Sequence, residues 1–467
     1  MISELPEEFK KRMMVQLGND YPAFEQSFEQ PAVRAFSLNT AVISVEQFES
    51  CAEASEELKY DKIPGMRHAY YYVDDMHIGR CAYHHAGMIY SQDPAAMLVA
   101  EGIELPEKAR VLDLCAAPGG KSVQLAQKLT DLGGILISNE PDKARNSILC
   151  SNIERMGFKN VAVTCMYPED LAVLYPSYFD AVLVDAPCSG EGMFRKYPES
   201  VEQWSPSNIE HCAIRQKDIL RSAVSMVKPG GTLVYSTCTY APEEDEEIAD
   251  FIRDELGFEL IDAPEIVTKY ATAVPLKNGT AYRFYPHVSK GEGQFMAYFQ
   301  KPGELDKNDF SDHIRPSGNL RPADRECFKL IEEAFNGLPD INADCVFRNG
   351  ETLFYLDRGI GRLPEKTVTK TGVCIGSVEK KRFIPHHDFF SAFGCSIKNR
   401  LELSPGSSEI SAYLHGEELR LSQIQNGVYS GGDKGFGTVT VLGVPLGGFK
   451  LAGGRIKNHY PKGLRNL

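Results

Sequence analysis

Short apolar runs alternate with segments of helical spacing between residues 108 and 302. The apolar runs predict buried strands over residues 110–115, 134–139, 161–166, 179–185 and 232–236. The segments between them predict helices over residues 121–129, 143–156 and 208–227. Asp142 has the short acceptor side chain of a helix N-cap, and Gly157 suits the turn that ends a helix. The alternation predicts an α/β fold whose parallel sheet is covered by helices on both faces.

Weaker patterns complete this core and precede it. Apolar residues over 258–262 and 294–300 predict two further strands, which makes a mostly parallel sheet of seven, and the core then ends near residue 302. A helix over 6–17 and a strand over 36–40 predict a small N-terminal domain before it.

The C-terminal third predicts smaller units. The polar stretch 301–322 is typical of a linker, and a helix over 323–335 with a β-rich stretch over 346–356 indicates a small α+β unit. The Gly-rich tail indicates a compact β domain. We therefore predict four domains, over residues 1–85, 86–302, 303–385 and 386–467.

Composition limits the class of protein. Hydrophobic residues make up 43% and charged residues 24% of the 467 residues, which is ordinary for a soluble globular protein. The N-terminal segment is charged, and no apolar run approaches the roughly 20 residues of a membrane helix. We expect a cytoplasmic protein without membrane contact and, by default, a monomer. The twelve cysteines stand singly, without zinc-site spacing, so we predict no metal.

Charge is unevenly distributed. The net charge of −14 argues against a nucleic-acid partner, because phosphate contacts need Lys and Arg. Residues 361–467, however, carry 15 Lys and Arg against 8 Asp and Glu, a balance of +7. This asymmetry is typical of a basic RNA-binding appendage on an acidic body, although chance scatter of surface charge also produces it.

A glycine-rich turn follows the first predicted strand, in the sequence Asp113-Leu-Cys-Ala-Ala-Pro-Gly-Gly-Lys121. Gly119 and Gly120 let the backbone approach a ligand, and the helix that begins near Lys121 presents free amides. The spacing fits neither a triphosphate loop nor GxGxxG. The next strand ends at Glu140, whose carboxylate can accept hydrogen bonds from ribose hydroxyls. These features favour an adenosine-type cofactor over a structural turn.

Two cysteines follow the ends of neighbouring strands. The sequence DAPCSG (185–190) brings Asp185 and Cys188 to the rim of the predicted sheet, and STCT (236–239) brings Cys238 there. Ligands of open α/β sheets bind at the carboxyl ends of the strands. A single buried cysteine is usually inert packing, but two thiols beside a carboxylate at this edge predict a reactive site.

Methylation of carbon 5 of cytosine requires such thiols, because that carbon is too weakly nucleophilic to take a methyl group from a sulfonium. A thiolate that adds at carbon 6 breaks the aromaticity and turns carbon 5 into an enamine carbon. A carboxylic acid that hydrogen-bonds the ring nitrogen favours this addition. The carbon-5 proton must then leave and the thiol be expelled, which needs a base. Methylation of oxygen or nitrogen needs no thiol.

The chain resembles the Sun-type RNA cytosine-5 methyltransferases, and most closely their bacterial RsmF-like group, which acts on 16S ribosomal RNA. The segments that carry the resemblance are HAGMIYSQDPAAM (85–97), DLCAAPGGK (113–121), DAPCSGEGMFRK (185–196), STCT (236–239), RFYPHV (283–288) and GEGQFM (291–296). The tail, from LGGFK (446–450) to KNHYPKGL (457–464), is similar to the group's PUA-like RNA-binding domain. The resemblance implies a class I (Rossmann-like) methyltransferase core, an RNA-binding-type N-terminal domain, S-adenosyl-L-methionine as cofactor and RNA as partner.

The resemblance also implies roles for individual residues. Cys238 becomes the nucleophile, Cys188 the thiol that assists proton removal and product release, and Asp185 a contact of the cytosine ring. Residues 115–121 hold the methionine part of the cofactor, Glu140 the ribose, and Asp170, beside Glu169, the region near the adenine; Arg145 is a basic position near the cofactor. The implied cofactor contacts are Cys115, Ala116, Ala117, Pro118, Gly119, Gly120, Lys121, Glu140, Arg145, Asp170 and Asp185.

Two other patterns have simpler interpretations. The acidic stretch EEDEEIAD (243–250) follows Pro242 and predicts a solvated helix start, where acids favour the positive end of the dipole, rather than a metal site. The adjacent His84 and His85 indicate packing rather than chelation.

Three alternatives stay open. In DNA cytosine-5 methyltransferases the Pro-Cys cysteine attacks, which would make Cys188 the nucleophile. A transfer RNA could be the substrate with the same chemistry. A ribosome-assembly factor could bind RNA and cofactor without catalysis.

Overall fold

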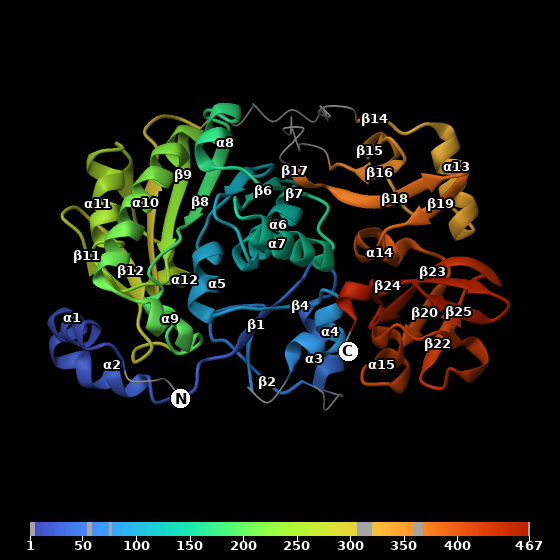
Figure 1. Ribbon diagram of the computed structural model, residues 1–467, viewed down its shortest axis with the longest axis horizontal. Coiled ribbons are helices and arrows are strands. Elements are labelled where there is room, and N and C mark those ends of the chain that lie inside the picture. The colour runs from blue at the N-terminus through green and yellow to red at the C-terminus, as the bar shows by residue number, and fades with distance from the viewer. Residues whose placement is uncertain (1–4, 54–57, 74–76, 306–319, 358–367, 466–467) are drawn as a thin grey trace.

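The computed structural model describes residues 5–53, 58–73, 77–305, 320–357 and 368–465, whose strands form four sheets (Figure 1). The central sheet is built on five parallel strands in the order β9-β8-β5-β6-β7. Their bounds are β5 Arg110–Asp113, β6 Ile135–Asn139, β7 Val161–Thr164, β8 Phe179–Asp185 and β9 Val227–Thr237. β5, β6 and β7 are buried at every position, because helices cover both faces. The strands predicted from apolar runs are confirmed.

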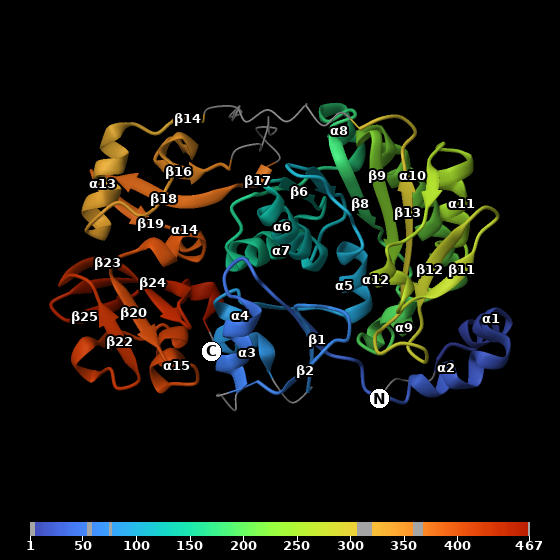
Figure 2. The same ribbon diagram turned by 180° about the vertical axis from the view of Figure 1, so that it is seen from behind.

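Neighbouring residues of each central strand enter two different cores. Val111 packs with Val123 and Leu149 on one face, whereas Leu112 packs with Leu171 and Leu220 on the other. The first face is covered by α5 (Pro94–Glu101), α6 (Gly120–Leu132) and α7 (Lys143–Met156). The second is covered by α8 (Pro168–Leu174), α10 (Pro206–Met226) and α11 (Glu246–Asp254), as Figures 1 and 2 show from opposite sides.

The predicted ends of α7 are confirmed. The Asp142 carboxylate accepts a hydrogen bond from the backbone N–H of Arg145 at 2.9 Å, as an N-cap does. Gly157 follows the last turn with a φ of 73°, the left-handed conformation that glycine adopts without steric cost.

The central sheet has ten strands among the described residues, where seven were predicted. Beyond β9 lie β10 (Glu259–Ile261), β11 (Thr272–Pro275), β12 (Thr280–Phe284) and β13 (Gln294–Gln300); at the other edge, β17 (Val368–Thr371) pairs antiparallel with β7. The β11–β12 hairpin escaped prediction because β11 is mostly exposed and has little apolar signal. β17 pairs with a strand that lies about two hundred residues earlier in the chain, and local sequence patterns do not specify so distant a partner.

The N-terminal region contributes two helices and a separate sheet. Helices α1 (Glu7–Leu17) and α2 (Tyr21–Ser27) pack Phe9 and Phe24 against Phe194, Trp204 and Tyr240 of the core. The four-stranded sheet β2-β3-β1-β4 comprises β1 (Ala35–Leu38), β2 (Tyr60–Lys62), β3 (Ala69–Tyr72) and β4 (Ile89–Ser91), with α3 (Val45–Glu53) and α4 (Ala82–His85).

The C-terminal region forms the remaining two sheets. The five-stranded sheet comprises β14 (Arg321–Pro322), β15 (Val346–Asn349), β16 (Thr352–Tyr355), β18 (Val373–Glu379) and β19 (Arg382–Pro385), with α13 (Arg325–Phe335). The six-stranded sheet comprises β20 (Arg400–Leu403), β21 (Leu419–Arg420), β22 (Gly427–Ser430), β23 (Lys434–Val441), β24 (Val444–Ala452) and β25 (Arg455–Asn458), with α14 (His387–Phe393) and α15 (Ser408–His415). Residues 306–319 of the predicted linker lie outside the described residues.

The last sheet packs on the N-terminal sheet. Phe36 and Leu38 belong to the same hydrophobic core as Leu401 and Leu446. His85 Nδ1 lies 2.7 Å from the hydroxyl of Tyr460, in agreement with the packing role predicted for the histidine pair. The N-terminal sheet and the last sheet therefore lie side by side, although they come from opposite parts of the chain (Figure 1). The division into four domains stays a prediction. In the part of the chain that the structure describes, no helix is long and apolar enough to cross a membrane.

Candidate active site

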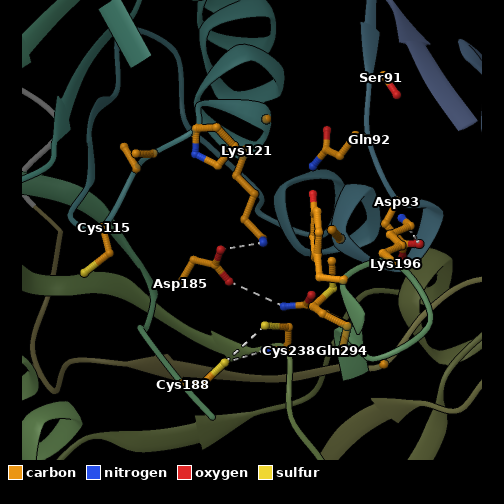
Figure 3. Close-up of a pocket in the computed structure, with 18 of the residues that line it drawn as sticks. Ser91, Gln92, Asp93, Cys115, Lys121, Asp185, Cys188, Lys196, Cys238 and Gln294 are labelled. Atoms are coloured by element: carbon orange, nitrogen blue, oxygen red, sulfur yellow. Dashed lines mark hydrogen bonds and ion pairs between the residues drawn. The ribbon is translucent and has the colours of Figure 1, made fainter. Parts of the chain in front are cut away.

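A cavity of about 490 Å³ lies at the carboxyl ends of β5, β8 and β9 (Figure 3). Ten of the predicted site residues line it, namely Cys115, Ala116, Ala117, Pro118, Gly120, Lys121, Arg145, Asp185, Cys188 and Cys238. Gly119 lies outside the lining, but its φ of 116° belongs to the left-handed region that this tight turn into α6 requires.

A smaller cavity of about 190 Å³ adjoins the first, because Cys115, Arg145 and Pro187 line both. Glu140 lies in the smaller cavity, where Arg145 Nη1 is 3.0 Å from its Oε2. A second contact, from Arg145 Nη2 to the Ala117 carbonyl at 2.9 Å, fixes the guanidinium between the cavities.

Asp170 is not brought into either cavity. It is exposed on α8, whereas its neighbour Glu169 lines the smaller cavity. The two side chains leave a short helix about 100° apart, so that only one of them can face the cavity. The role of Asp170 stays a prediction, and Glu169 is the acid that the geometry places there.

Asp113 forms the floor of the larger cavity at the end of β5. Its Oδ2 accepts a hydrogen bond from Ser122 Oγ at 2.7 Å, and its Oδ1 has no donor among the described residues. Burial raises the pKa of Asp113 to about 7. Burial also raises the pKa of the Cys115 thiol, which is therefore an uncharged wall of the site.

The two predicted catalytic cysteines lie together. The loops after β8 and β9 place Cys188 Sγ 3.1 Å from Cys238 Sγ, and the Cys238 backbone N–H donates to Cys188 Sγ at 3.3 Å. The contact with Cys238, reinforced by burial, raises the pKa of Cys188 well above that of a free thiol. Cys188 is therefore protonated near neutral pH and can donate its S–H to the neighbouring sulfur.

Asp185 faces the same space from the end of β8 (Figure 3). Lys121 Nζ lies 2.7 Å from its Oδ2, and Ser236 Oγ donates to its Oδ1 at 2.7 Å. A longer contact of 3.4 Å comes from Gln294 Nε2. These donors fix the carboxyl group beside the cysteines, with a cation in contact.

The loops that carry the cysteines rest on buried acids that sequence reasoning missed. Glu244 accepts hydrogen bonds from the Ser189 backbone N–H at 2.9 Å and from Gln216 Nε2 at 3.0 Å. Glu191 accepts from Thr239 Oγ1 at 3.0 Å and from Trp204 Nε1 at 2.9 Å. Each acid thus holds the residue that follows a cysteine: Ser189 after Cys188, and Thr239 after Cys238. The only signal in the sequence that could have identified these two acids is that each lies within a few residues of a cysteine motif.

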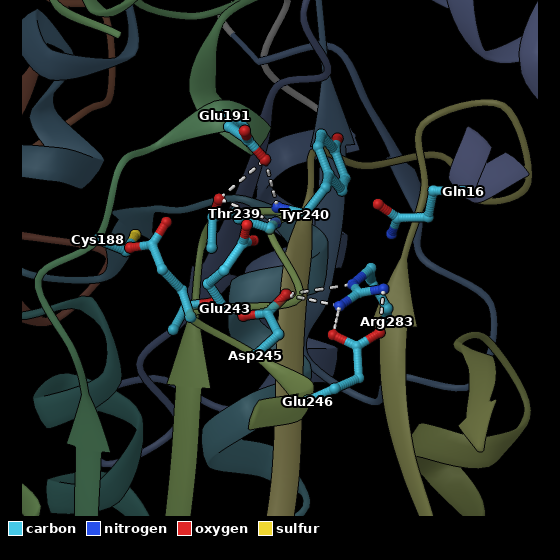
Figure 4. Close-up of polar contacts among 12 residues, drawn as sticks. Gln16, Cys188, Glu191, Thr239, Tyr240, Glu243, Asp245, Glu246 and Arg283 are labelled. Carbon is cyan, nitrogen blue, oxygen red and sulfur yellow. Dashed lines mark hydrogen bonds and ion pairs between the residues drawn. The ribbon is translucent and has the colours of Figure 1, made fainter. Parts of the chain in front are cut away.

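The prediction of a solvated acidic stretch at 243–250 is wrong for Glu244 and Asp245, which are both 0% exposed. Asp245 Oδ2 lies 2.8 Å from Arg283 Nη2 (Figure 4). Thr237 Oγ1 donates a hydrogen bond to Asp245 Oδ1. Because α11 begins only at Glu246, the two preceding acids turn toward the core instead of capping the helix in water. The partners from α10, β12 and the Cys188 loop lie 28 to 55 residues away in sequence.

Burial raises the pKa of Glu244 to about 7, from an ordinary value of 4.5. The folded protein therefore binds this proton more tightly than the unfolded chain, and the stability that protonation supplies is lost as the pH rises from 4.5 to 7. Glu244→Gln is neutral at every pH. We therefore expect its free energy of unfolding to rise by about 3 kcal/mol relative to that of the wild type between pH 5 and pH 8. The free energy of unfolding in urea at each pH measures this. The exposed Glu333→Gln serves as control, and a Glu244→Gln difference that is constant with pH would contradict the prediction.

Three family profiles match successive parts of the chain. They are described as the N-terminal domain of 16S rRNA methyltransferase RsmF (residues 5–94), 16S rRNA methyltransferase RsmB/F (residues 101–300) and the methyltransferase RsmF PUA domain (residues 399–466).

Relatives named "Ribosomal RNA small subunit methyltransferase F" are similar along nearly the whole chain. The protein of Aliivibrio fischeri (strain ATCC 700601 / ES114) is 30% identical over 460 residues, which are 94% of this chain and 93% of the relative. The protein of Klebsiella pneumoniae (strain 342) is 28% identical over 477 residues, covering 98% and 96%.

Solved structures from Pyrococcus horikoshii share the fold. A methyltransferase homologue has a TM-score of 0.51 and 26% identity, covering 61% of this chain and 91% of its own. NSun6, solved with SFG, has a TM-score of 0.56 and 22% identity, covering 64% of this chain and 99% of its own. The predicted methyltransferase core with a C-terminal PUA domain is confirmed.

Proposed function

This chain belongs to the RsmF family of 16S ribosomal RNA methyltransferases, and on that basis we propose that it methylates carbon 5 of a cytosine in 16S ribosomal RNA, with S-adenosylmethionine as donor. One observation carries the choice of carbon 5: two thiols lie 3.1 Å apart in the cavity that Asp185 lines. Methyl transfer to oxygen or nitrogen has no use for such a pair.

The residues present suit S-adenosylmethionine. Asp113 Oδ1 and Gln92 Oε1 line the larger cavity as buried acceptors without a donor among the described residues, and the cofactor's ammonium group is such a donor. A Cβ on Gly120 would lie 2.9 Å from Gln92, so only glycine leaves that wall in place. Glu140 in the smaller cavity suits the ribose hydroxyls. When bound, the cofactor supplies an electrophilic methyl group on its sulfonium.

The first half of the reaction uses Cys238 and Asp185. Cys238 loses its S–H proton to solvent and its sulfur forms a bond to cytosine carbon 6. The electron pair of the ring's 5,6 double bond moves toward ring nitrogen 3. The Lys121–Asp185 pair supplies a hydrogen bond and a proton to that nitrogen, which makes carbon 5 nucleophilic. Ser236 holds Asp185 in place during this step.

The second half uses Cys188. After methylation, carbon 5 carries both a methyl group and a proton. Cys188 passes its S–H proton to the Cys238 sulfur and takes the carbon-5 proton, the C–S bond breaks, and the 5,6 double bond forms again. Both cysteines end as thiols, and the proton on nitrogen 3 returns to the Lys121–Asp185 pair. The one proton released overall is the one that Cys238 lost before it attacked. The protonated state of Cys188 and its contact with Cys238 support this relay.

The choice of RNA as substrate rests on the family and on charge. The match to the RsmF PUA domain covers residues 399–466, within the stretch from 361 that carries a balance of +7. That sheet packs on the N-terminal sheet, whose residues Ala35, Tyr90 and Ser91 line the cavity. Basic residues there provide the phosphate contacts that the acidic body does not.

A map of 5-methylcytosine in total RNA, from cells with and without the gene, tests the proposal. We expect the signal to disappear at one or a few positions of 16S ribosomal RNA and to return with a plasmid copy. Loss confined to a transfer RNA would keep the chemistry and overturn the substrate. No change at any position, with the gene expressed, would contradict the proposal and favour an assembly factor without catalysis.

A further inference from the structure

A second large cavity, of about 580 Å³, opens between the N-terminal sheet and the core. Its floor is apolar and is formed by Ile63, Met66, Pro94, Ala95, Leu98 and Phe284. Two tyrosines, Tyr71 and Tyr270, stand in its wall. The mechanism proposed above uses none of these residues.

The rim of this cavity is basic. Lys62, Lys269 and Lys290 line it and are exposed, and the one acid in the lining is Asp61. Lys62 is paired with Glu49 at 2.8 Å, so the unpaired charge lies on the other two lysines. Lys290 Nζ lies 3.8 Å from the centre of the Tyr71 ring, and Lys269 Nζ lies 5.5 Å from that of Tyr270. Apart from these ring contacts, neither of the two lysines has an ion-pair partner among the described residues. In a chain of net charge −14, this rim is a local site for an anion.

One polar group in the wall of the cavity lacks a hydrogen-bond partner among the described residues. The hydroxyl of Tyr270 is buried and makes no hydrogen bond with any described residue. A buried hydroxyl without a partner costs free energy, so the group is suited to a ligand that supplies the missing bond. The ligand indicated by these walls is flat and apolar on its faces, polar at its edge, and attached to negative charge.

The cavity shares a wall with the active site. Asp93 and Ala96 line the catalytic cavity, whereas Pro94 and Ala95, between them in sequence, line this one. On the facing segment, Gly293 and Gln294 line the catalytic cavity and Gly291 lines the other. The two segments are joined, since the Glu292 backbone N–H donates to Asp93 Oδ2 at 3.2 Å. Asp93 and Gln294 mark the catalytic side of this wall in Figure 3.

We propose that this second cavity binds an unpaired base of the RNA strand within two nucleotides of the target cytosine, with the adjoining phosphates on Lys269 and Lys290. The inference rests on the proposed function, because a cytosine must leave its stack to enter the catalytic cavity. Its neighbours then lose a stacking partner, and an aromatic wall with a basic rim is how proteins hold such single-stranded bases. Because the wall between the two cavities is only a few residues thick, a base within two nucleotides of the target can reach the second cavity.

The test pairs protein variants with altered RNA. The substrate is the 16S fragment identified by the 5-methylcytosine map, made synthetically with an abasic site at one position within two nucleotides of the target. Methyl transfer from labelled S-adenosylmethionine gives kcat/KM. For the wild type, we expect one abasic position to lower kcat/KM roughly 10-fold, the size of a lost base–aromatic stack.

Tyr270→Leu, which removes the ring, should lower kcat/KM on intact RNA by a similar factor and show no further loss on that abasic RNA. Tyr270→Phe keeps the ring, so its kcat/KM should still fall on the abasic RNA by most of the wild-type factor. Lys290→Ala should lower kcat/KM and flatten its dependence on salt, whereas Lys329→Ala, on the exposed face of α13, should match the wild type. Cofactor binding and melting temperature establish that each variant is folded.

Equal losses from every abasic position in wild type and Tyr270→Leu would overturn the inference. So would wild-type rates that are the same on intact and abasic RNA. Failure of the proposed function has a different signature, because the wild type would then transfer no methyl group to any RNA.

Discussion

Replacement of Cys238 by alanine is expected to abolish methyl transfer, with kcat lowered by roughly 10³-fold or more. Without the Cys238 sulfur the proposed nucleophile is missing, and carbon 5 stays too weakly nucleophilic. Binding of cofactor and RNA should persist, since Asp185, Lys121 and the cofactor cavities are unchanged. Labelled methyl transfer measures the rate, and equilibrium binding shows that the substrates are still held.

The same variant should form no covalent complex with RNA. An RNA in which 5-fluorocytosine replaces the target traps the wild type after methylation, because carbon 5 then has no proton to lose. Cys238→Ala should give no slower-migrating band on a denaturing gel with this RNA. Cys395→Ala, on an exposed cysteine of the C-terminal region, is the matched control and should be trapped like the wild type.

Replacement of Cys188 by alanine should have the opposite effect on the complex. Addition and methylation still occur, but no S–H lies beside the departing Cys238 sulfur and nothing takes the carbon-5 proton. We expect the variant to accumulate a protein–RNA adduct on unmodified RNA and to make less than one product per enzyme. A denaturing gel with labelled RNA shows the adduct, and Cys188→Ala/Cys238→Ala should not form it.

The two single variants also decide which cysteine attacks. If Cys188→Ala formed no adduct and Cys238→Ala were trapped on RNA, Cys188 would be the nucleophile, as in the DNA enzymes. If both variants turned over at wild-type rates, the thiol mechanism itself would be wrong. The short distance between the sulfurs makes the experiment necessary, because position alone allows either sulfur to face the base.

The protonation of two buried acids near the site changes around neutral pH, so these measurements must be made at a controlled pH. Glu244, which holds the loop of Cys188, and Asp113, at the floor of the cofactor cavity, both have a pKa raised to about 7 by burial. Both acids lose their protons as the pH rises through neutrality, so adducts and rates are best compared at one pH and again on either side of it.

The sequence by itself determined the central strands, the helix α7 with its two ends, and the motifs that carry the cysteines. These features are local: a buried strand is a short apolar run, a cap is one acceptor side chain, and a turn at φ 116° needs glycine at position 119. Parallel strands also present their carboxyl ends on one edge, which is why Asp185, Cys188 and Cys238 could be predicted to meet.

Only the tertiary structure decided the rest, because it depends on partners far apart in the chain. Glu244 and Asp245 read as solvated acids, yet Ser189, Gln216 and Arg283 make their burial possible. The pairing of β17 with β7, the orientation of Glu169 rather than Asp170, and the basic cavity at Tyr270 likewise arise from contacts between distant segments. Whether a charged side chain is buried, or an edge strand is paired, depends on the segment that packs against it. Local sequence does not specify that segment.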